Sequence, residues 1–453
     1  MITVMKFGGT SVGSPEALKR VANIVLNEKG PKVVVVSAMS GVTNFLIGVP
    51  QIPLDARKDF ITQFERKHLD VAEQLLDASL LDEFMKDFTP RFNRFKELLT
   101  SDGSTDPFYM DDVTSQGERF SSLILSYLLR SMGAKSVALT SEDCGIAAEG
   151  KPLFGSGDLQ RTEAMIHLTI KPHIGQGEIP ILTGFYGINP DGRPLTFGRG
   201  GSDYSAAVVA NALNAGLLEI WTDVDGFMSA DPRIVPDAVK MDEMSFEEAA
   251  ELAYFGAKVL HPRTIEPVRV KHIPLKVRNS FKPEEPGTLI HHLRKPEDRL
   301  LKSVALKTDL CIITISSAEI AYHPGIVARI IEKVAEDDVI VYSISTSLST
   351  VALLVHSNDV NVALNRLNLL NNGEIERIEV KHKVALICAV GDNLIGKCGA
   401  SADIFGAVKD ARANVEMISE GASDVSLNFV VPMARAINVV EVLHQRYVVG
   451  GCR

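Results

Sequence analysis

The stretch MITVMKFGGTSVGSPEALKRVANIVLNEKGPKVVVV, residues 1–36, decides the fold class. Two short apolar runs, Ile2–Met5 and Val33–Val36, have the length and the β-branched content of buried strands. Between them lies Pro15–Leu26, which starts with a proline and has the pattern of a helix. A strand, a helix and a second strand in this order predict a parallel pair with a helical crossover.

The same alternation continues to about residue 290. It predicts a three-layer α/β domain with a mostly parallel sheet over residues 1–292. Further predicted strands are Val137–Leu139, Ile179–Leu182, Glu219–Trp221 and Ile273–Val277, and further predicted helices are Glu118–Arg130, Ser202–Leu213 and Ser245–Phe255. Residues 54–99 are charged and periodic, which predicts added helices. Residues 293–307 are predicted to be a linker, because prolines recur in this region.

The rest of the chain contains an internal repeat. When Gly325 is aligned with Gly399, the two segments match without a gap, so that Ile344 and Ser345 meet Ile418 and Ser419. Each copy predicts a βαββαβ unit, and the repeat is too long for a solenoid. We therefore expect two small ferredoxin-like domains, residues 308–380 and 381–453. Such a pair could serve assembly alone, because a fold does not determine a function.

The composition is typical of a soluble protein. The 453 residues are 45% hydrophobic and 23% charged, and no apolar stretch is long enough to cross a bilayer. The first residues lack the pattern of a secretory signal. Five scattered cysteines without a CxxC pair argue against a disulfide framework or a zinc site and favour a reducing compartment. The net charge of −10 argues against a nucleic-acid partner, so a cytoplasmic enzyme is expected.

The first chemical motif is Lys6-Phe7-Gly8-Gly9-Thr10-Ser11-Val12, between the first predicted strand and helix. Glycines let the backbone approach a polyphosphate, and the helix N-terminus attracts its negative charge. Lys6 adds a fixed positive charge. An ordinary glycine turn has a similar sequence, so the loop alone does not establish a phosphate site.

The second motif is Phe197-Gly198-Arg199-Gly200-Gly201-Ser202-Asp203, again before a predicted helix. Arg199 lies between glycines, and a guanidinium group can hold a carboxylate with two parallel hydrogen bonds. Asp203 lies in the first helical turn, where it either caps the helix or holds a metal–phosphate group.

Three further motifs contribute charged groups. In Ser115-Gln116-Gly117-Glu118-Arg119, Glu118 either compensates the helix dipole or binds an ammonium group. Thr222–Gly226 and the nearby Arg233 follow a strand, at the edge where open α/β sheets bind ligands. In Phe255–Pro262, Lys258 is either a surface lysine or a contact to phosphate or ribose.

Gly145–Lys151 has the spacing of a P-loop but is a decoy. Pro152 stands where the motif needs a hydroxyl group, and no buried strand leads directly into the segment. The eleven histidines show no paired metal-ligand spacing.

These groups suit a carboxylate as phosphate acceptor. A side-chain carboxylate with a pKa of about 3.9 is ionised at neutral pH, so it needs no general base. Phosphoryl transfer then depends on positioning and on neutralising charge. Cations for the phosphates, Arg199 for a carboxylate and Glu118 for an ammonium group would meet these needs.

In their order and spacing, the five motifs resemble those of the aspartate kinases of the amino-acid-kinase family, and the repeat looks like the tandem ACT domains of those enzymes. The resemblance covers essentially the whole chain. Uridylate, carbamate and acetylglutamate kinases share the core fold but generally lack this Gly-Arg-Gly-Gly-Ser-Asp string and the paired ACT domains. The chain stops at Arg453 without an appended homoserine dehydrogenase, so a monofunctional enzyme is expected.

The resemblance implies transfer of the γ-phosphate of ATP, with Mg, to the β-carboxylate of L-aspartate. The product is 4-phospho-L-aspartate, and the reaction is the first step of lysine, threonine and methionine biosynthesis. A homodimer or a dimer of dimers, joined through the ACT domains, is implied as well. So is feedback regulation through these domains.

The resemblance also implies roles for individual residues. It assigns catalysis to Lys6, Arg199 and Asp203. Asp203 would also organise the magnesium ion through the ATP phosphates. Aspartate would be bound by Thr43, Glu118, Arg199 and Ser202. ATP would be bound by Lys6, Gly8, Gly9, Ser11, Thr222, Asp223, Met228, Arg233, Lys258 and Val259. Relatives often have a tyrosine at the position of Met228, so the adenine contact is expected to differ here.

The feedback amino acid would bind between paired first ACT domains, at His323, Gly325, Ile340 and Tyr342. Relatives that are inhibited by lysine tend to place an acid on this strand, where the present chain has Tyr342. An unpaired buried ammonium group costs several kcal/mol, so this replacement disfavours lysine. Lysine and threonine both stay open as effectors.

Three alternatives remain. A kinase for another small acid, such as glutamate, would need Thr43, Glu118 and Arg199 to accept a longer side chain. An inactive amino-acid sensor is disfavoured because the charged residues of the motifs are all present. The ACT pair could also serve dimerisation only.

Overall fold

The computed structural model describes residues 1–103, 105–257, 259–294, 299–323, 325–370 and 375–450. These residues form two compact units, which are taken in turn below. The first unit comprises Met1–Phe227, Met241–Phe246 and Val259–Leu293, and the second comprises Met228–Lys240, Glu247–Lys258 and Arg294–Arg453. None of the described helices combines the length and the apolar character that a membrane span requires.

The first unit is built on an eight-stranded sheet with the order β10-β12-β11-β9-β1-β2-β6-β3. Its strands are Glu243–Ser245 (β10), Thr288–His291 (β12), Leu275–Asn279 (β11), Leu217–Thr222 (β9), Thr3–Phe7 (β1), Lys32–Val36 (β2), Ile179–Thr183 (β6) and Ser136–Leu139 (β3). Neighbouring strands are parallel, except that β11 and β12 are antiparallel. The predicted α/β fold with a mostly parallel sheet is confirmed, and each predicted strand of this domain is present.

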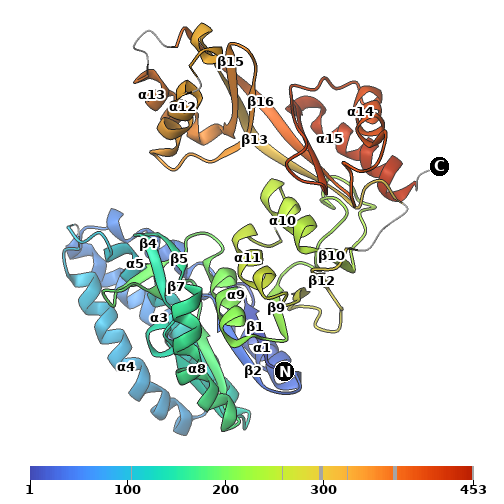
Figure 1. Ribbon diagram of the computed structural model, residues 1–453. Coiled ribbons are helices and arrows are strands. Elements are labelled where there is room, and N and C mark those ends of the chain that lie inside the picture. The colour runs from blue at the N-terminus through green and yellow to red at the C-terminus, as the bar shows by residue number, and fades with distance from the viewer. Residues whose placement is uncertain (104, 258, 295–298, 324, 371–374, 451–453) are drawn as a thin grey trace. The chain divides into compact units, whose positions relative to one another are not determined.

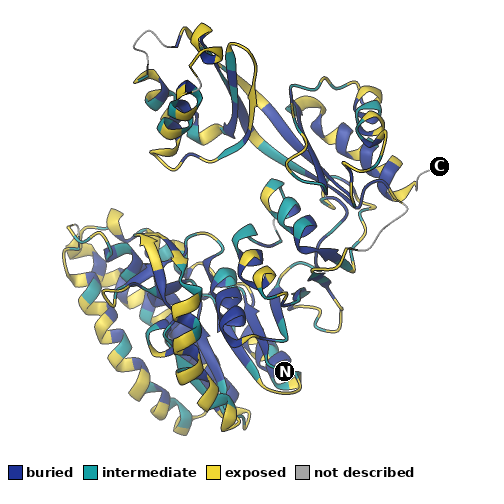
Figure 2. Cartoon of the chain, in the orientation of Figure 1, coloured by how far each residue is buried: buried dark blue, intermediate teal, exposed yellow. Residues whose placement is uncertain are grey.

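Helices form a layer on each face of the sheet (Figure 1). One layer contains α1 (Pro15–Asn27), α6 (Gln116–Ser131), α3 (Arg57–Leu75) and α4 (Ala78–Thr100), and the other contains α8 (Leu159–Gly175), α9 (Gly201–Leu213) and α11 (Ile265–Val270). Helix α6 is buried along nearly its whole length because it lies between the sheet and the pair α3 and α4. Figure 2 shows the buried strands and the exposed outer sides of α4 and α8.

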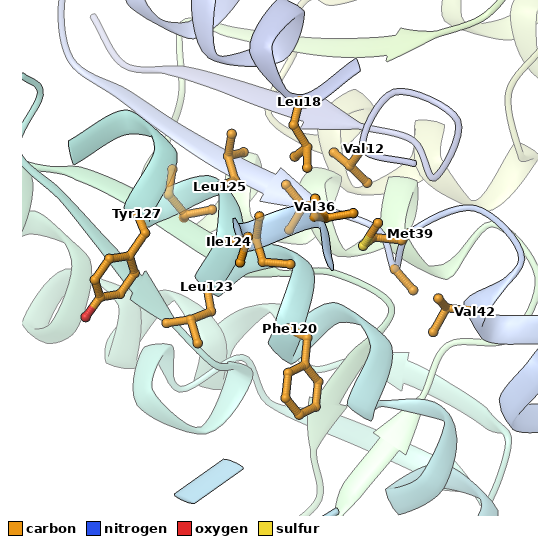
Figure 3. Packing of buried hydrophobic residues seen from close by; sticks show 14 of the residues in the cluster. Val12, Leu18, Val36, Met39, Val42, Phe120, Leu123, Ile124, Leu125 and Tyr127 are labelled. Carbon is orange, nitrogen blue, oxygen red and sulfur yellow. The ribbon is translucent and has the colours of Figure 1, made fainter. Parts of the chain in front are cut away.

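An apolar core between α6 and the sheet supports the loop that follows β2. Figure 3 shows Ile124 of α6 beside Val36, with Met39 and Val42 beyond the end of the strand, and Phe120 one turn earlier on α6. All five are almost completely buried. Burying side chains of this size stabilises the loop by about 1.5–3 kcal/mol each, so it has little freedom to move.

The second unit contains a six-stranded antiparallel sheet with the order β14-β15-β13-β16-β18-β17. Its strands are Val341–Thr346 (β14), Thr350–His356 (β15), Ser303–Ser316 (β13), Arg377–Val390 (β16), Ser426–Pro432 (β18) and Met417–Ser419 (β17). Helices α12 (Gly325–Ala335) and α13 (Val360–Asn368) cover one half of the sheet, and α14 (Ala400–Asp410) and α15 (Met433–Leu443) cover the other. Each half has its own apolar core, as two repeated domains require.

The two halves share the long strands β13 and β16, so their boundaries differ from those expected. Residues 303–307 were predicted to be linker, but they form the first part of β13 and pair with 386–390 of β16. The expected boundary between residues 380 and 381 falls inside β16. The prolines in this region suggested a linker up to residue 307, but the apolar Val304 and Ala305 gain burial by joining the sheet.

Candidate functional site

Loops that follow four parallel strands meet at one edge of the first sheet. The backbone N–H of Gly8 donates to the carbonyl of Trp221 at 3.2 Å, and that of Ser40 donates to the carbonyl of Gly9 at 3.1 Å. The N–H of Ser280 donates to the carbonyl of Thr222 at 2.8 Å. The loops after β1, β2, β9 and β11 are thereby joined at the carboxyl ends of their strands, where ligands bind in open α/β sheets.

The glycine loop after β1 is tightly packed against the loop after β2. A Cβ atom added to Gly9 would lie 2.9 Å from the carbonyl oxygen of Ala38, so only glycine fits there. The buried hydroxyl groups of Ser11 and Ser280 are hydrogen-bonded at 2.8 Å. Ser14 caps α1 by accepting from the N–H of Ala17. The loop is therefore held in place before any ligand binds.

Lys6, at the end of β1, forms an ion pair with Asp203 of α9. Their side chains are only 9% and 16% exposed. The capping residue of α9 is Gly200, and no side chain caps the helix, so Asp203 is not a helix cap. The ammonium group of Lys6 also lies near Gly8, 3.6 Å from the position of an added Cβ atom. A cation and an anion are thus placed over the glycine loop.

Glu118, in the first turn of α6, is fully buried. Burial raises the pKa of its carboxyl group to about 8, although a backbone hydrogen bond from Ala38 and the nearby charge of Lys6 act in the opposite direction. Its Oε2 atom has no hydrogen-bond partner among the described residues. A buried acid without enough partners is costly, and such groups concentrate at functional sites.

Gly117 allows the carboxylate of Glu118 to lie close to the loop after β2. A Cβ atom at Gly117 would lie 2.5 Å from the Cβ of Ala38, so the glycine lets α6 approach the loop after β2. The adjacent Arg119 has a different task, because it forms an ion pair with Glu142 and stacks over the ring of Tyr186. Among the described residues, the carboxylate of Glu118 has no ion-pair partner comparable to the one that Glu142 gives Arg119.

Arg199 lies in the turn between β8 (Pro194–Thr196) and α9, and it is exposed. Its guanidinium group forms no hydrogen bond or ion pair with any residue that the structure describes. The flanking Gly198 and Gly200 have φ of 70° and 71°, a left-handed conformation that favours glycine. A side chain at Gly200 would also collide with His261. The turn therefore presents an unpaired arginine.

Two further residues expected to bind aspartate lie in the first turns of helices. Thr43 lies in the first turn of α2 (Val42–Ile47) and is half-buried. Ser202 is buried at the start of α9, where a Cβ atom added to Gly184 would lie 2.9 Å from the Cβ of Ser202. Thr43 follows the loop after β2, and Ser202 packs against Gly184 just after β6, so both lie at the same edge of the sheet.

The residues expected to bind the nucleotide are only partly brought together. Thr222 ends β9 and Asp223 follows it at the sheet edge, and their side chains are hydrogen-bonded to each other at 3.1 Å. Met228 and Arg233 belong to the second unit, where the exposed Arg233 pairs with Asp231 at 2.6 Å. Val259 is half-buried in the first unit, and Lys258 lies outside the described residues. The nucleotide contacts of these residues stay predictions.

The expected effector residues lie in the first half of the second unit. His323 is exposed and pairs with Glu319, Gly325 begins α12, and Ile340 is 52% exposed. Tyr342 is half-buried, its ring 5.7 Å from that of Tyr254. The ammonium group of Lys307 lies 4.4 Å from the centre of the Tyr342 ring, a cation–π contact. The structure thus shows a cation already present at Tyr342.

Sequence reasoning missed several residues of the site. Ser280, which binds Ser11, has a weak sequence signal, namely its place just after a predicted strand. Asp111 and Arg263 showed no signal, because their partners lie far away in the chain. Their contacts are described below.

The fold and this site define the class of the protein. A model of the amino acid kinase family matches residues 1–279, and a model of the ACT domain matches residues 387–447. The chain therefore belongs to the amino acid kinase family. It is 32% identical to lysine-sensitive aspartokinase 3 of Escherichia coli over 98% of both chains. Within the family it is an aspartate kinase, a phosphotransferase with a carboxyl group as acceptor, with ACT domains for allosteric regulation.

Two solved structures of an aspartokinase are similar to the chain over nearly its whole length. The chain resembles E. coli aspartokinase III in complex with aspartate and ADP, with a TM-score of 0.84, 31% identity and coverage of 98% and 99% of the two chains. It also resembles the complex of that enzyme with lysine and aspartate, with a TM-score of 0.82, 32% identity and the same coverage. It spans about half the length of the plant bifunctional aspartokinase/homoserine dehydrogenases that it matches.

Proposed function

We propose that the edge formed by the loops after β1, β2, β9 and β11 is where the γ-phosphate of ATP is transferred to the β-carboxylate of L-aspartate. One observation carries this proposal. The Lys6–Asp203 pair lies over the glycine loop, close enough for the charge of Lys6 to act on the buried carboxyl group of Glu118. A phosphate site and an ammonium site are therefore neighbours, as phosphorylation of an amino acid requires.

ATP would bind with its phosphates over Gly8 and Gly9. The N-terminus of α1 and the ammonium group of Lys6 both favour negative charge there. Ser11 is held by Ser280, so its backbone is already positioned. The expected contacts of Thr222, Asp223 and Val259 would add to the nucleotide site.

Aspartate would bind with its ammonium group on Glu118 and its α-carboxylate on Arg199. Glu118 offers a buried oxygen without a partner, and Arg199 offers an unpaired guanidinium group. Thr43 and Ser202 would add hydrogen bonds. The ammonium group would also lower the pKa of Glu118, because a nearby positive charge favours the ionised carboxylate. Substrate binding and ionisation of Glu118 are thus coupled.

In the reaction, an oxygen of the β-carboxylate attacks the γ-phosphorus while the bond to the bridging oxygen of ADP breaks. The acceptor is already ionised, so no residue has to remove a proton. Lys6 would neutralise charge on the transferring group, and Asp203 would hold Lys6 in place. Arg199 and Glu118 would fix the aspartate at both α-substituents, which leaves the β-carboxylate directed at the phosphate.

Magnesium is proposed as the metal of this reaction. The described residues contain no group of three or more side chains suited to hold a metal ion on their own. One carboxylate, Asp203, lies over the glycine loop. This fits magnesium, which usually binds through one or two carboxylates together with substrate phosphates and water. When bound, the ion would neutralise phosphate charge.

The experiment is a steady-state assay of ADP release with aspartate and, separately, with glutamate. Arg199→Ala should raise KM for aspartate and leave KM for ATP nearly unchanged, because the arginine contacts only the acceptor. Equal use of glutamate by the wild type would refute a site that selects aspartate, and normal aspartate kinetics in Arg199→Ala would refute the role of the arginine.

We further propose that an amino acid regulates the enzyme at the first half of the second unit, near His323, Gly325, Ile340 and Tyr342. Lysine is one candidate, because a relative of 32% identity is lysine-sensitive. Threonine is the other, because Lys307 already places a positive charge at Tyr342. The side-chain ammonium group of lysine would be repelled there by the ammonium group of Lys307.

Inhibition by lysine and by threonine, each at millimolar concentration, separates the two effectors. Lys307→Met should strengthen inhibition by lysine, because it removes the competing charge. Tyr342→Asp should do so as well, because an acid there would pair with the ammonium group. Unchanged lysine sensitivity in both variants would place the effector elsewhere.

We also propose a homodimer as the smallest assembly. Strand β14 is an edge of the six-stranded sheet, and Ile344 on it and Leu348 after it are exposed. Apolar edge strands are ready to pair with another chain. Light scattering should show at least a dimer for the wild type and a smaller mass for Ile344→Lys.

A further inference from the structure

The turn that carries Arg199 is packed against a small hairpin formed by β4 (Ala148–Lys151) and β5 (Phe154–Gly157). A Cβ atom added to Gly155 would lie 2.8 Å from the side chain of Leu195 and 3.0 Å from the carbonyl oxygen of Thr196. One added to Gly198 would lie 3.4 Å from the carbonyl oxygen of Leu153. The hairpin includes Gly150-Lys151, the end of the P-loop-like segment. This segment has no part in the proposed phosphate site. Its position indicates a different role.

Asp111, on the short helix α5 (Tyr109–Thr114), joins the hairpin to β8. Its carboxylate accepts from both the N–H and the hydroxyl group of Thr196, each at 2.7 Å, and from the N–H of Leu153 at 3.0 Å. Asp111 is fully buried, and burial raises the pKa of its carboxyl group although these bonds oppose the rise. A buried carboxylate of this kind holds its donors strongly.

Arg263, in the turn Pro262–Thr264, joins the hairpin to the residue that follows Thr196, on the same N-terminal side of the turn that carries Arg199. Its guanidinium group donates to the carbonyl of Phe197 at 3.0 Å and to the carbonyl of Gly155 at 2.8 Å. It also donates to the hydroxyl group of Ser156 at 3.1 Å and stacks over the ring of Tyr204 at 4.6 Å. Arg263 thus connects the hairpin, the turn and the first helical turn of α9, which contains Asp203.

We propose that Arg263 and Asp111 are positioning residues for the aspartate substrate. Each ties the backbone just before Gly198 and Arg199 to the β4–β5 hairpin, Asp111 through Thr196 and Arg263 through Phe197. Arg199 itself has no partner among the described residues, so its direction depends on the backbone that carries it. The inference rests on the proposed role of Arg199 as the carboxylate ligand.

The physical argument concerns the freedom of the turn. Gly198, Gly200 and Gly201 give it a flexible backbone, and fixing each residue costs conformational entropy. Without the two anchors, aspartate binding would have to order the turn itself. A displacement of about 1 Å at a reacting group can cost roughly 100-fold in rate. The ATP phosphates bind at the loop after β1, so the loss should concern aspartate selectively.

The test compares Arg263→Ala, Arg263→Lys and Arg269→Ala in the full-length enzyme. Arg269 lies on the neighbouring α11, is exposed and pairs only with Glu266 in the described structure, so it is a matched control. Arg263→Ala should raise KM for aspartate about tenfold or more, as expected for a turn that is no longer held in place. KM for ATP should change less than about twofold, because ATP does not contact the turn that Arg263 holds in place. Arg263→Lys should recover part of the loss, because an ammonium group can still bind one of the carbonyls.

The melting temperature of each variant is measured together with its kinetics. Asp111→Asn, which keeps the shape of the side chain but removes its charge, should show the same selective rise in KM for aspartate. Equal rises in KM for aspartate and ATP, or normal aspartate kinetics in Arg263→Ala, would overturn the proposal. Should Arg263→Ala fail to fold, the comparison of Arg263→Lys with the wild type decides by the same criterion.

Arg199→Ala is included to separate the two levels of the argument. If it impairs aspartate binding while Arg263→Ala does not, the positioning role is wrong and the substrate site stands. If neither variant affects aspartate, the assignment of Arg199 is wrong, and the positioning role is overturned with it.

Discussion

Glu118→Gln is predicted to weaken substrate binding and, at the same time, to stabilise the unliganded protein. Glutamine has the same shape as glutamate but carries no charge, so it cannot form an ion pair with the ammonium group of aspartate. It also removes a buried acid whose pKa is raised by burial from 4.5 to about 8. Substrate affinity and fold stability should therefore change in opposite directions.

The size of the stability effect follows from the pKa. A rise from 4.5 to about 8 corresponds to about 5 kcal/mol, which is the upper limit of the destabilisation by the ionised group. The amide of glutamine also needs hydrogen-bond partners in this buried place, so we expect a net gain of about 1–3 kcal/mol. A gain of this size should raise the melting temperature by roughly 3 °C or more.

The stability difference between Glu118→Gln and the wild type should depend on pH. The pKa of Glu118 is higher in the folded protein than in the unfolded chain, so its contribution to stability is complete below pH 4.5 and is lost as the pH rises to about 8. Glutamine does not titrate. Glu118→Gln should therefore match the wild type near pH 5, exceed it increasingly towards pH 8 and keep a constant advantage above that pH.

The assay is thermal unfolding without ligands at pH 5 and pH 8, together with KM for aspartate at pH 8. Glu97→Gln, on the exposed side of α4, serves as the control for a change from glutamate to glutamine. We expect KM for aspartate to rise at least about tenfold in Glu118→Gln, as for the loss of a charge-assisted hydrogen bond. A stability difference that is the same at both pH values would refute the reasoning, and so would normal aspartate binding.

Three further predictions concern the remaining charges and the glycine loop. Lys6→Ala should lower kcat by about 10²–10³, because it removes charge stabilisation at the transferring group; a loss below about threefold in a turnover assay would assign Lys6 a structural role. Gly9→Ala should raise KM for ATP, because its Cβ would lie 2.9 Å from the carbonyl of Ala38 and move the loop; unchanged ATP kinetics would contradict this. In the wild type, KM for aspartate should fall as the pH rises towards 8, because Glu118 must be ionised to bind the ammonium group; a flat profile would argue against that role.

Much of the first unit could be predicted from the sequence because its signals are local. Parallel strands that are buried on both faces appear as continuous β-branched runs such as Val33–Val36, and these runs coincide with strands of the sheet. The glycine turns after β1 and before α9 were predicted to be ligand loops for a similar reason. Glycines let the backbone approach a ligand, and the structure adds that Gly198 and Gly200 have positive φ, a conformation that favours glycine.

The second unit shows where local patterns mislead. The repeat predicted two domains with a boundary between residues 380 and 381 and a linker up to residue 307. In the structure, β13 and β16 are each 14 residues long and run through both halves. Pairing between strands depends on partners far away in the chain, which no local pattern of prolines reveals.

The sequence by itself determined the class of the fold, the internal repeat and the types of side chain available for chemistry, because glycines, apolar runs and charges act over a few neighbouring residues. The tertiary structure alone decided how those side chains are used. It paired Asp203 with Lys6, left Glu118 buried without enough partners, and turned Asp111 and Arg263 into anchors for the turn that carries Arg199. These relations join residues that lie far apart in the chain, and burial and hydrogen bonding act through space rather than along the sequence.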